Sequence, residues 1–149
     1  MNDFVKPDFR MCSDPPDCDV EKVKEELKAF NDGIVGDDNH EELNLCIHNG
    51  EGQLIAGLCG GTYWGWLNIE RLWVHENYRS RGLGKLLVET AEKQAIDRGC
   101  RHAHVDTMDF QAPGMYTKLG YRVMTEYRNL PAGHSRIFLT KSLSDTSES

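Results

Sequence analysis

The sequence predicts a mixed α/β fold, with a mostly antiparallel central sheet and helices packed on both faces. Two observations lead to this class. Segments with strand and helix periodicity alternate along the chain, and short turns join neighbouring strands into hairpins, which are antiparallel. With 149 residues, of which 39% are hydrophobic, the chain can form one domain with its own core but has little room for two. We therefore expect a single domain over residues 1–143.

The first half of the chain is predicted to contain one helix and three consecutive strands. Residues 1–18 are polar and interrupted by proline, and only a short strand at Phe9–Met11 is expected there. Asp19 can cap a helix that runs to about Asn31, because Val20, Val23, Leu27 and Phe30 recur at helical spacing. Alternation of apolar and polar residues then predicts, in order, strands at 43–48, 54–63 and 66–74.

The second half begins with a change from strand to helix periodicity. An apolar stripe from Gly82 onward predicts an amphipathic helix that stops at Gly99. The elements expected after it are a strand at 101–107, a short helix at 113–119 closed by Gly120, and strands at 121–129 and 134–141. The tail "SLSDTSES" is predicted to be disordered, with residues 144–149 outside the domain.

Composition and charge exclude several classes of protein. The net charge of -7 argues against nucleic-acid binding, because neutralising phosphates requires a clustered basic face. No segment approaches the roughly 20 apolar residues of a membrane span, and the first residues do not resemble a signal peptide, so we expect a cytoplasmic protein without membrane contact. The five cysteines are scattered, without zinc or disulfide spacing, and are expected to be free thiols.

The segment "YRSRGLGKLL", residues 78–87, has the features of an anion site. A glycine turn that leads into a helix directs free backbone N–H groups and a positive dipole end at one point, and Arg79, Arg81 and Lys85 add positive charge. A dinucleotide fingerprint would need glycine where Leu87 stands, and a P-loop would need Ser or Thr after Lys85. The segment therefore supports neither NAD nor ATP, and a lone G-x-G with solvated cations remains the alternative.

The wider context of this turn resembles the GNAT superfamily of N-acyltransferases. In "RLWVHENYRSRGLGKLLVETAEKQAIDRGC", Arg79, Gly82 and Gly84 match the acetyl-CoA signature of that family. In "VDTMDFQAPGMYTKLGYR", Tyr116 precedes a Gly-aromatic pair, as in the family's next strand and helix. The resemblance implies that acetyl-CoA is the cosubstrate, that no metal is needed, and that the strand before the turn splays away from the next one. The cofactor contacts that it implies come from Leu72, Trp73, Val74, Arg79, Arg81, Gly82, Leu83, Gly84, Lys85 and Gln111.

The resemblance also assigns catalytic roles. Tyr116 matches the family tyrosine that acts as general acid at the CoA sulfur, and packing is its alternative role. A backbone amide near Val74 would polarise the thioester carbonyl. Gln111 is either a cofactor contact or a residue that only begins the helix.

The general base is less well specified by the sequence. Strict alternation puts Asn68, Glu70 and Leu72 on one face of their strand and Ile69, Arg71 and Trp73 on the other. Glu70 could accept the proton of the amine through water, or could be structural if paired with Arg71 or Arg128. The other carboxylates considered for binding a cationic amine are Asp106 and Asp109, for which solvated loop positions are the alternative.

Other conspicuous residues support no separate site. His102 and His104 share a strand face, but two histidines do not make a metal site. Trp64, Trp66 and Trp73 would either line an acceptor pocket or simply pack.

The sequence thus predicts an acetyl-CoA-dependent N-acetyltransferase that acts on a small-molecule or peptide amine by direct transfer in a ternary complex. The alternative is a catalytically silent acyl-CoA sensor, which would have no need of Tyr116. The acceptor cannot be identified, and a homodimer through exposed strands is an additional expectation.

Overall fold

The computed structural model describes residues 8–143, and the chain divides into two compact units, residues 1–38 and 39–149. The single domain expected over residues 1–143 stays a prediction. The predicted disordered tail at 144–149 lies outside the described residues.

The first unit contains one helix, α1 (Asp17–Val35). It is longer at both ends than the helix predicted between Asp19 and Asn31. Asp17 and Asp19 lie in its first turn, where negative charge interacts favourably with the helix dipole. The strand predicted at Phe9–Met11 is wrong, because these residues form no regular structure. Within the described part of this unit, no other residue buries the apolar stripe of α1, which consists of Val20, Val23, Leu27, Phe30 and Ile34.

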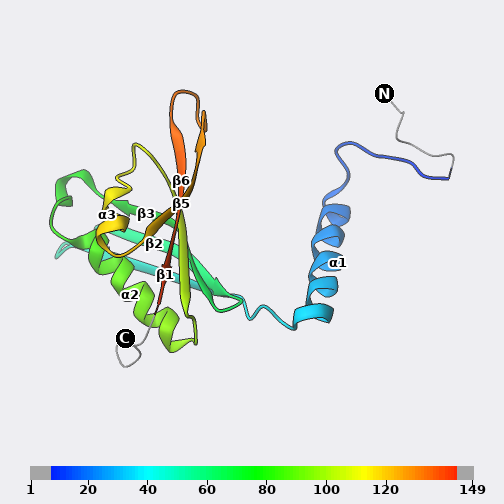
Figure 1. Cartoon of the computed structure of the whole chain (residues 1–149), viewed down its shortest axis with the longest axis horizontal. Coiled ribbons are helices and arrows are strands. Elements are labelled where there is room, and N and C mark those ends of the chain that lie inside the picture. Colours follow the sequence, from blue (N-terminus) through cyan, green and yellow to red (C-terminus); the bar gives the residue numbers. More distant parts are fainter. Residues whose placement is uncertain (1–7, 144–149) are drawn as a thin grey trace. The chain divides into compact units, whose positions relative to one another are not determined.

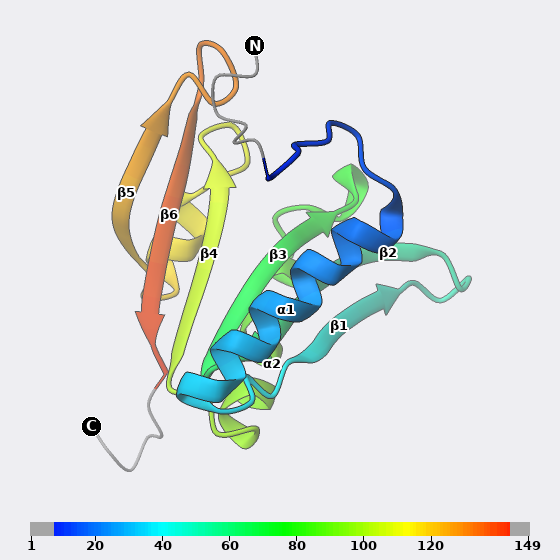
Figure 2. The ribbon, with the colours of Figure 1, turned by 90° about the vertical axis from the view of Figure 1, so that its right-hand side faces the viewer.

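The second unit is built on a six-stranded sheet with the order β1-β2-β3-β4-β6-β5 (Figures 1 and 2). The strands are β1 (Glu41–His48), β2 (Leu54–Tyr63), β3 (Trp66–Val74), β4 (His102–Met108), β5 (Arg122–Arg128) and β6 (Ser135–Ser142). β3 and β4 are parallel, and the other neighbouring pairs are antiparallel. The predicted mixed, mostly antiparallel sheet is therefore confirmed.

Two α-helices cover one face of this sheet. α2 (Leu83–Asp97) connects β3 to β4, and α3 (Gly114–Lys118) connects β4 to β5. Both lie on the same side of the sheet (Figure 1). The core between α2 and the sheet contains fully buried side chains from both layers, among them Leu58, Leu67, Ile69, Val88 and Ala91. A short 3-10 helix, η1 (Glu76–Tyr78), precedes α2. Among the described residues, no helix is long and apolar enough to cross a membrane.

Candidate active site

β3 and β4 are paired along only part of their length. Their parallel pairing extends from Trp66 opposite His102 to Ile69 opposite Val105. Beyond these residues the two strands diverge (Figure 2). The second half of β3 is consequently bonded to β2 on one side but not to β4 on the other. This is the separation of strands that the sequence resemblance implied.

A β-bulge in β3 lies at the point of divergence. Across the β2–β3 pair, Ile69 is opposite Gly60 and Arg71 is opposite Cys59, so that Glu70 is an extra residue without a partner. Such a bulge bends its strand and increases the local twist. The bulge therefore accounts for the direction in which β3 leaves β4.

The bulge also changes which side chains share a face. Glu70 and Arg71 are both exposed, whereas Leu72 packs against the core together with Ile69. The strict alternation expected from the sequence is therefore wrong from Arg71 onward. Leu72 lies on the core face, and Arg71 and the half-exposed Trp73 lie on the opposite face. An extra residue moves every later side chain to the other face, because strand periodicity is two.

A pocket opens where the strands separate. It is lined by Ile69, Glu70, Arg71 and Leu72 of β3, by Val105, Asp106 and Thr107 of β4, and by Gln111 and Tyr116 beyond β4. The structure thus brings together three residues that the sequence singled out for different roles, namely Tyr116, Glu70 and Asp106. One phenol and two carboxylates face a single pocket.

Tyr116 is the buried acid group of this pocket. Only 4% of the residue is exposed, and its ring contacts Tyr121 edge to face at 5.6 Å between centroids. Burial, and secondarily the charge of Asp106, raise the pKa of Tyr116 to about 12. Among the described residues, none accepts a hydrogen bond from its hydroxyl. The phenol is therefore protonated at neutral pH and can donate to a molecule in the pocket.

A buried polar network supports the tyrosine ring. The Tyr121 hydroxyl donates to Glu92 Oε2 at 2.8 Å, and Lys141 Nζ contacts both carboxylate oxygens of Glu92 at 3.0 and 3.1 Å. Burial and the neighbouring Glu92 carboxylate raise the pKa of Tyr121. The network joins α2 to β6 directly behind Tyr116, so it fixes the ring that Tyr116 packs against.

The two pocket carboxylates have different partners. Glu70 is half exposed, and its Oε2 lies 3.9 Å from Arg71 Nη1, which makes a loose surface pair. Asp106 Oδ1 accepts hydrogen bonds from Arg136 Nε at 2.8 Å and from Nη2 at 2.6 Å. The alternative partner considered for Glu70, Arg128, is not the one observed.

Both carboxylate oxygens of Asp109 have partners near the start of β6. Its Oδ1 lies 3.0 Å from His134 Nδ1, and its Oδ2 accepts a hydrogen bond from the backbone N–H of Ser135 at 3.1 Å. The ring of Phe110 packs on His134 at 5.0 Å. Asp109 is an exposed carboxylate that joins the end of β4 to the start of β6.

The predicted anion turn forms a left-handed entry to α2. Ser80 and Gly82 have φ angles of 63° and 81°, and α2 begins at Leu83 with no side-chain cap. The first backbone N–H groups of a helix have no partner within it. In α2 they belong to Leu83, Gly84 and Lys85, so that the turn presents unpaired donors next to the end of β3.

The cations around the turn are held in different ways. Arg79 Nε donates to the carbonyl of Val74 at 3.1 Å, and the Arg81 guanidinium lies 5.2 Å from the centre of the Tyr78 ring. Lys85 is exposed. All three are close in sequence to the free N–H groups, a combination that suits a phosphate group.

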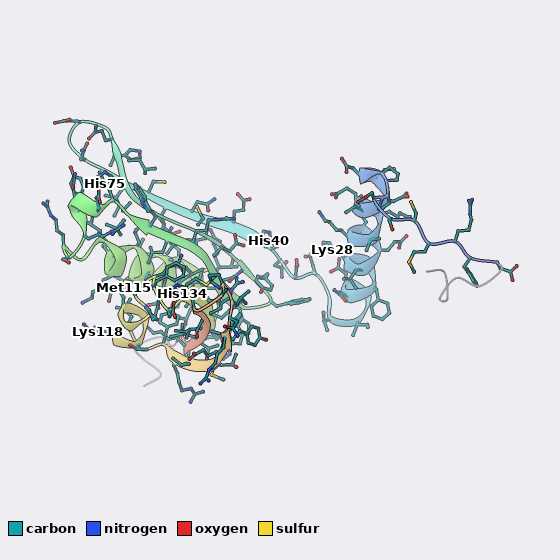
Figure 3. The ribbon with its side chains drawn as sticks, turned by 90° about the horizontal axis from the view of Figure 1, so that it is seen from above. Lys28, His40, His75, Met115, Lys118 and His134 are labelled. Atoms are coloured by element: carbon teal, nitrogen blue, oxygen red, sulfur yellow. The ribbon has the colours of Figure 1, made fainter. Side chains whose placement is uncertain are left out.

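Two further predicted cofactor contacts, Gly84 and Gln111, also have contacts within the protein. A Cβ on Gly84 would lie 2.9 Å from Met115 Sδ, so this glycine allows α2 to approach α3. Met115 of α3 is labelled in Figure 3, beside α2. Gln111 Oε1 accepts hydrogen bonds from the Met108 N–H at 3.0 Å and the Thr107 hydroxyl at 3.3 Å. The amide nitrogen of Gln111 is the part that is left to contact a ligand.

Trp66, His102 and His104 form a separate cluster with Tyr63. Trp66 stacks on His102 with ring centres 4.7 Å apart, and His104 Nε2 lies 3.2 Å from the Tyr63 hydroxyl. Burial lowers the pKa of His104, and the charge of Asp106 opposes this. No group of three potential ligands that could hold a metal ion is found in residues 8–143.

Comparison with known proteins identifies the family. The model of the acetyltransferase (GNAT) family matches residues 5–121. This chain belongs to the GNAT family. An acetyltransferase of Agrobacterium fabrum is 34% identical over 130 residues, which cover 87% of this chain and 95% of the relative. A blasticidin-S acetyltransferase of Streptomyces morookaense is 41% identical over 93 residues, covering 62% of this chain and 68% of the relative. The crystal structure of an acetyltransferase from Bacillus cereus matches with a TM-score of 0.85 and 33% identity, covering 90% of this chain and 98% of that chain.

Membership of the GNAT family confirms that the protein is an acyltransferase of a family that uses acetyl-CoA. It does not assign individual roles, so the catalytic and cofactor-binding residues remain predictions. Arg136, which holds the pocket residue Asp106, was not singled out from the sequence. Its contact with Asp106 depends on how β4 and β6 are paired, and no local pattern in the sequence indicates it.

Proposed function

We propose that this GNAT protein transfers the acetyl group of acetyl-CoA directly to a primary amine of a small molecule or peptide within a ternary complex. The pocket between the diverging strands supports this proposal, because it contains an acid and two carboxylates at one place. Transfer from a thioester to an amine needs a donor for the leaving sulfur and an acceptor for the proton of the amine. Both kinds of group line the pocket.

The chain has suitable groups for CoA along one path. The unpaired N–H groups at the start of α2, with Arg79, Arg81 and Lys85 nearby, would hold the diphosphate. The β3 backbone from Leu72 to Val74, which has no β4 partner, would pair with the pantetheine arm. Bound acetyl-CoA supplies the activated acetyl group as a thioester.

Tyr116 acts as the acid in this proposal. Its hydroxyl is neutral at physiological pH and has no acceptor among the described residues. It therefore donates a hydrogen bond to the departing sulfur, where negative charge develops. A backbone N–H near Val74 would polarise the carbonyl.

Glu70 accepts the proton that the amine must lose. It lies on the bulge at the mouth of the pocket and is half exposed, so that water can connect it to the amine. The loose contact with Arg71 leaves its carboxylate free to move.

The acceptor is proposed to be a small amine. GNAT acetyltransferases act on small-molecule or other amine substrates, and the relative from Streptomyces morookaense is named for blasticidin S. Blasticidin S is therefore the first acceptor to test, followed by polyamines, aminoglycosides and peptides with a free N-terminus.

The test is an assay of thiol release from acetyl-CoA with this panel of amines. Four of the five cysteines are exposed, so the enzyme is used in catalytic amounts and a reaction without amine is subtracted. Mass spectrometry of the amine must show one added acetyl group. An amine-dependent thiol release with an acetylated product supports the proposal, and stabilisation by acetyl-CoA without any turnover would instead favour a silent sensor.

Thermal unfolding provides an independent test of the cosubstrate. Acetyl-CoA should raise the unfolding temperature without magnesium, because a ligand that binds the folded state stabilises it by mass action. ATP and NAD should have a smaller effect at equal concentration. Equal stabilisation by ATP would contradict a CoA site and indicate a general phosphate site.

Two other expectations from the sequence stay predictions. Cytoplasmic location is tested by fractionating cells that produce the protein. Homodimer formation is tested by sedimentation equilibrium of the purified chain.

A further inference from the structure

The carboxylate of Asp106 is fixed by one side chain that comes from another strand. Arg136 donates through Nε and Nη2, and both bonds end on Oδ1 of Asp106. Among the described residues, none donates a hydrogen bond to Oδ2. The side chains are about one-third exposed, at 36% for Arg136 and 35% for Asp106. One oxygen of the carboxylate is therefore occupied, while the other can accept a further donor.

Arg136 is itself held in place. It lies opposite Met108 in the β4–β6 pair, and its guanidinium lies 5.7 Å from the centre of the Phe138 ring. The preceding residue, Ser135, donates its backbone N–H to Asp109. The start of β6 is thus joined to the end of β4 on both sides of Arg136, so this arginine is a firm support for Asp106.

The fixed carboxylate faces the reaction pocket. Asp106 and Tyr116 both line it, and the charge of Asp106 contributes to the raised pKa of Tyr116. The other two carboxylates are less suited to hold a ligand in a defined position. Glu70 is half exposed with one loose contact, and both oxygens of Asp109 are occupied.

We propose that Asp106 binds the amino group of the acceptor through Oδ2, and that Arg136 is a positioning residue that fixes the Asp106 carboxylate for this contact. The proposal rests on the acetyl transfer to an amine proposed above. A carboxylate that is already fixed loses little freedom when the acceptor binds, and the amine is held at a defined distance from the thioester. The positive charge of Arg136 offsets the negative charge of Asp106. The site therefore holds the amine mainly through a directed hydrogen bond.

The proposal is tested with Asp106→Asn, Arg136→Gln and the double variant. Blasticidin S is the acceptor, replaced by the fastest amine of the panel if blasticidin S is not acetylated. Asp106→Asn should raise the KM for the amine about 10- to 150-fold, the value of a hydrogen bond to a charged group. The KM for acetyl-CoA should stay within about twofold, since none of the proposed CoA contacts involves Asp106.

Arg136→Gln should also raise the KM for the amine, by less than Asp106→Asn does. Arg136→Lys should restore part of the loss, because it keeps the charge but not the two-nitrogen contact. Arg122→Gln is the matched control, since Arg122 is an exposed arginine of the same hairpin outside the pocket. It should leave both KM values unchanged, and thermal unfolding of each variant shows that it is folded.

The double variant distinguishes positioning from a general structural effect. If Arg136 acts through Asp106, the double variant is no worse than Asp106→Asn alone, because the two changes remove one interaction. Additive losses, or equal losses for amine and acetyl-CoA, would overturn the positioning role. An unchanged KM for the amine in Asp106→Asn would overturn the binding role. If the parent enzyme acetylates no amine, the proposed function fails and this inference with it.

Discussion

Replacing Tyr116 with phenylalanine is the sharpest test of the proposed chemistry. The change keeps the ring that packs on Tyr121 and removes only the hydroxyl. Acetyl-CoA binding should be retained, because the proposed contacts come from the glycine turn and the β3 backbone. The effect should therefore appear in kcat.

The pKa of Tyr116 determines how large this effect should be. With a pKa of about 12, the phenol is a weaker acid than a thiol, whose reference pKa is about 8.5. The difference of about 3.5 corresponds to about 5 kcal/mol against full proton transfer to a released thiolate. We therefore expect Tyr116 to stabilise the developing thiolate through a hydrogen bond. A hydrogen bond to a charged group contributes about 1.5–3 kcal/mol, so kcat should fall about 10- to 150-fold.

The assay is thiol release under saturating acetyl-CoA and amine, with single-turnover measurements to show that chemistry limits the rate. Tyr127→Phe is the matched control, because Tyr127 is a half-exposed tyrosine of β5 that does not line the pocket. A thioester with a more acidic thiol should reduce the loss caused by Tyr116→Phe. An unchanged kcat would show that Tyr116 only packs, and a loss well above about a thousandfold would refute the hydrogen-bond argument in favour of proton transfer.

The remaining predictions concern Glu70, Gly84 and Lys141. Glu70→Gln should lower turnover mainly at low pH, where the amine is protonated, and the affinity for acetyl-CoA should not change. If the variant and the parent enzyme have the same pH profile of turnover, Glu70 has a structural role. Gly84→Val should destabilise the protein by about 1–3 kcal/mol through Met115, and Met115→Ala should relieve this in urea unfolding. Gly84→Val should also lose acetyl-CoA binding, and if the double variant does not recover that binding, Gly84 also faces the ligand. Lys141→Met leaves the carboxylate of Glu92 buried without its cation. The free energy of unfolding should fall by about 3 kcal/mol, the low end for buried pairs, because Lys141 is partly exposed. An unchanged free energy in urea unfolding would show that the protein accommodates Glu92 without Lys141.

Most of the sheet could be predicted because its residues follow simple periodicities. The strands at 54–63 and 66–74 have the predicted bounds, since turn residues mark both ends. The strand at Phe9–Met11 failed, because three residues in a polar segment give no periodicity to interpret. Strict alternation failed in β3 for the opposite reason, as the pattern was regular but the strand contains a bulge.

A signal for that bulge was present in the partner strand. Gly60 lies within β2, and a glycine inside a strand often marks a bulge or a close backbone contact. In the structure, a Cβ at Gly60 would overlap the carbonyl oxygen of Asn68. The sequence therefore indicated an irregularity near this point, but not that the extra residue would be Glu70 in the neighbouring strand.

The candidate site was predictable to the extent that it is local in sequence. The glycine turn and Tyr116 are recognised from short motifs, whereas Asp106 and Arg136 are 30 residues apart and meet only through the register of β4 and β6. The contacts of Asp109 could not be predicted for the same reason, because its partners His134 and Ser135 lie on the hairpin.

The location of the site follows from the parallel pair in the described sheet. A parallel connection needs a crossover, and here α2 provides it, so the helix begins where β3 ends. The free N–H groups of α2 and the unpaired edge of β3 therefore lie at the same end of the sheet. The β4 side of the gap is different, because the contacts of Asp106 and Asp109 join it firmly to β6. An extended cosubstrate can pair with the backbone of β3 that has no β4 partner. On the other side of the gap, β4 carries the Asp106 carboxylate that we assign to the amine. Acetyl-CoA would then approach Tyr116 along β3, and the amine along β4. Substitutions at Arg136 are therefore expected to weaken binding of the acceptor and to leave acetyl-CoA binding intact.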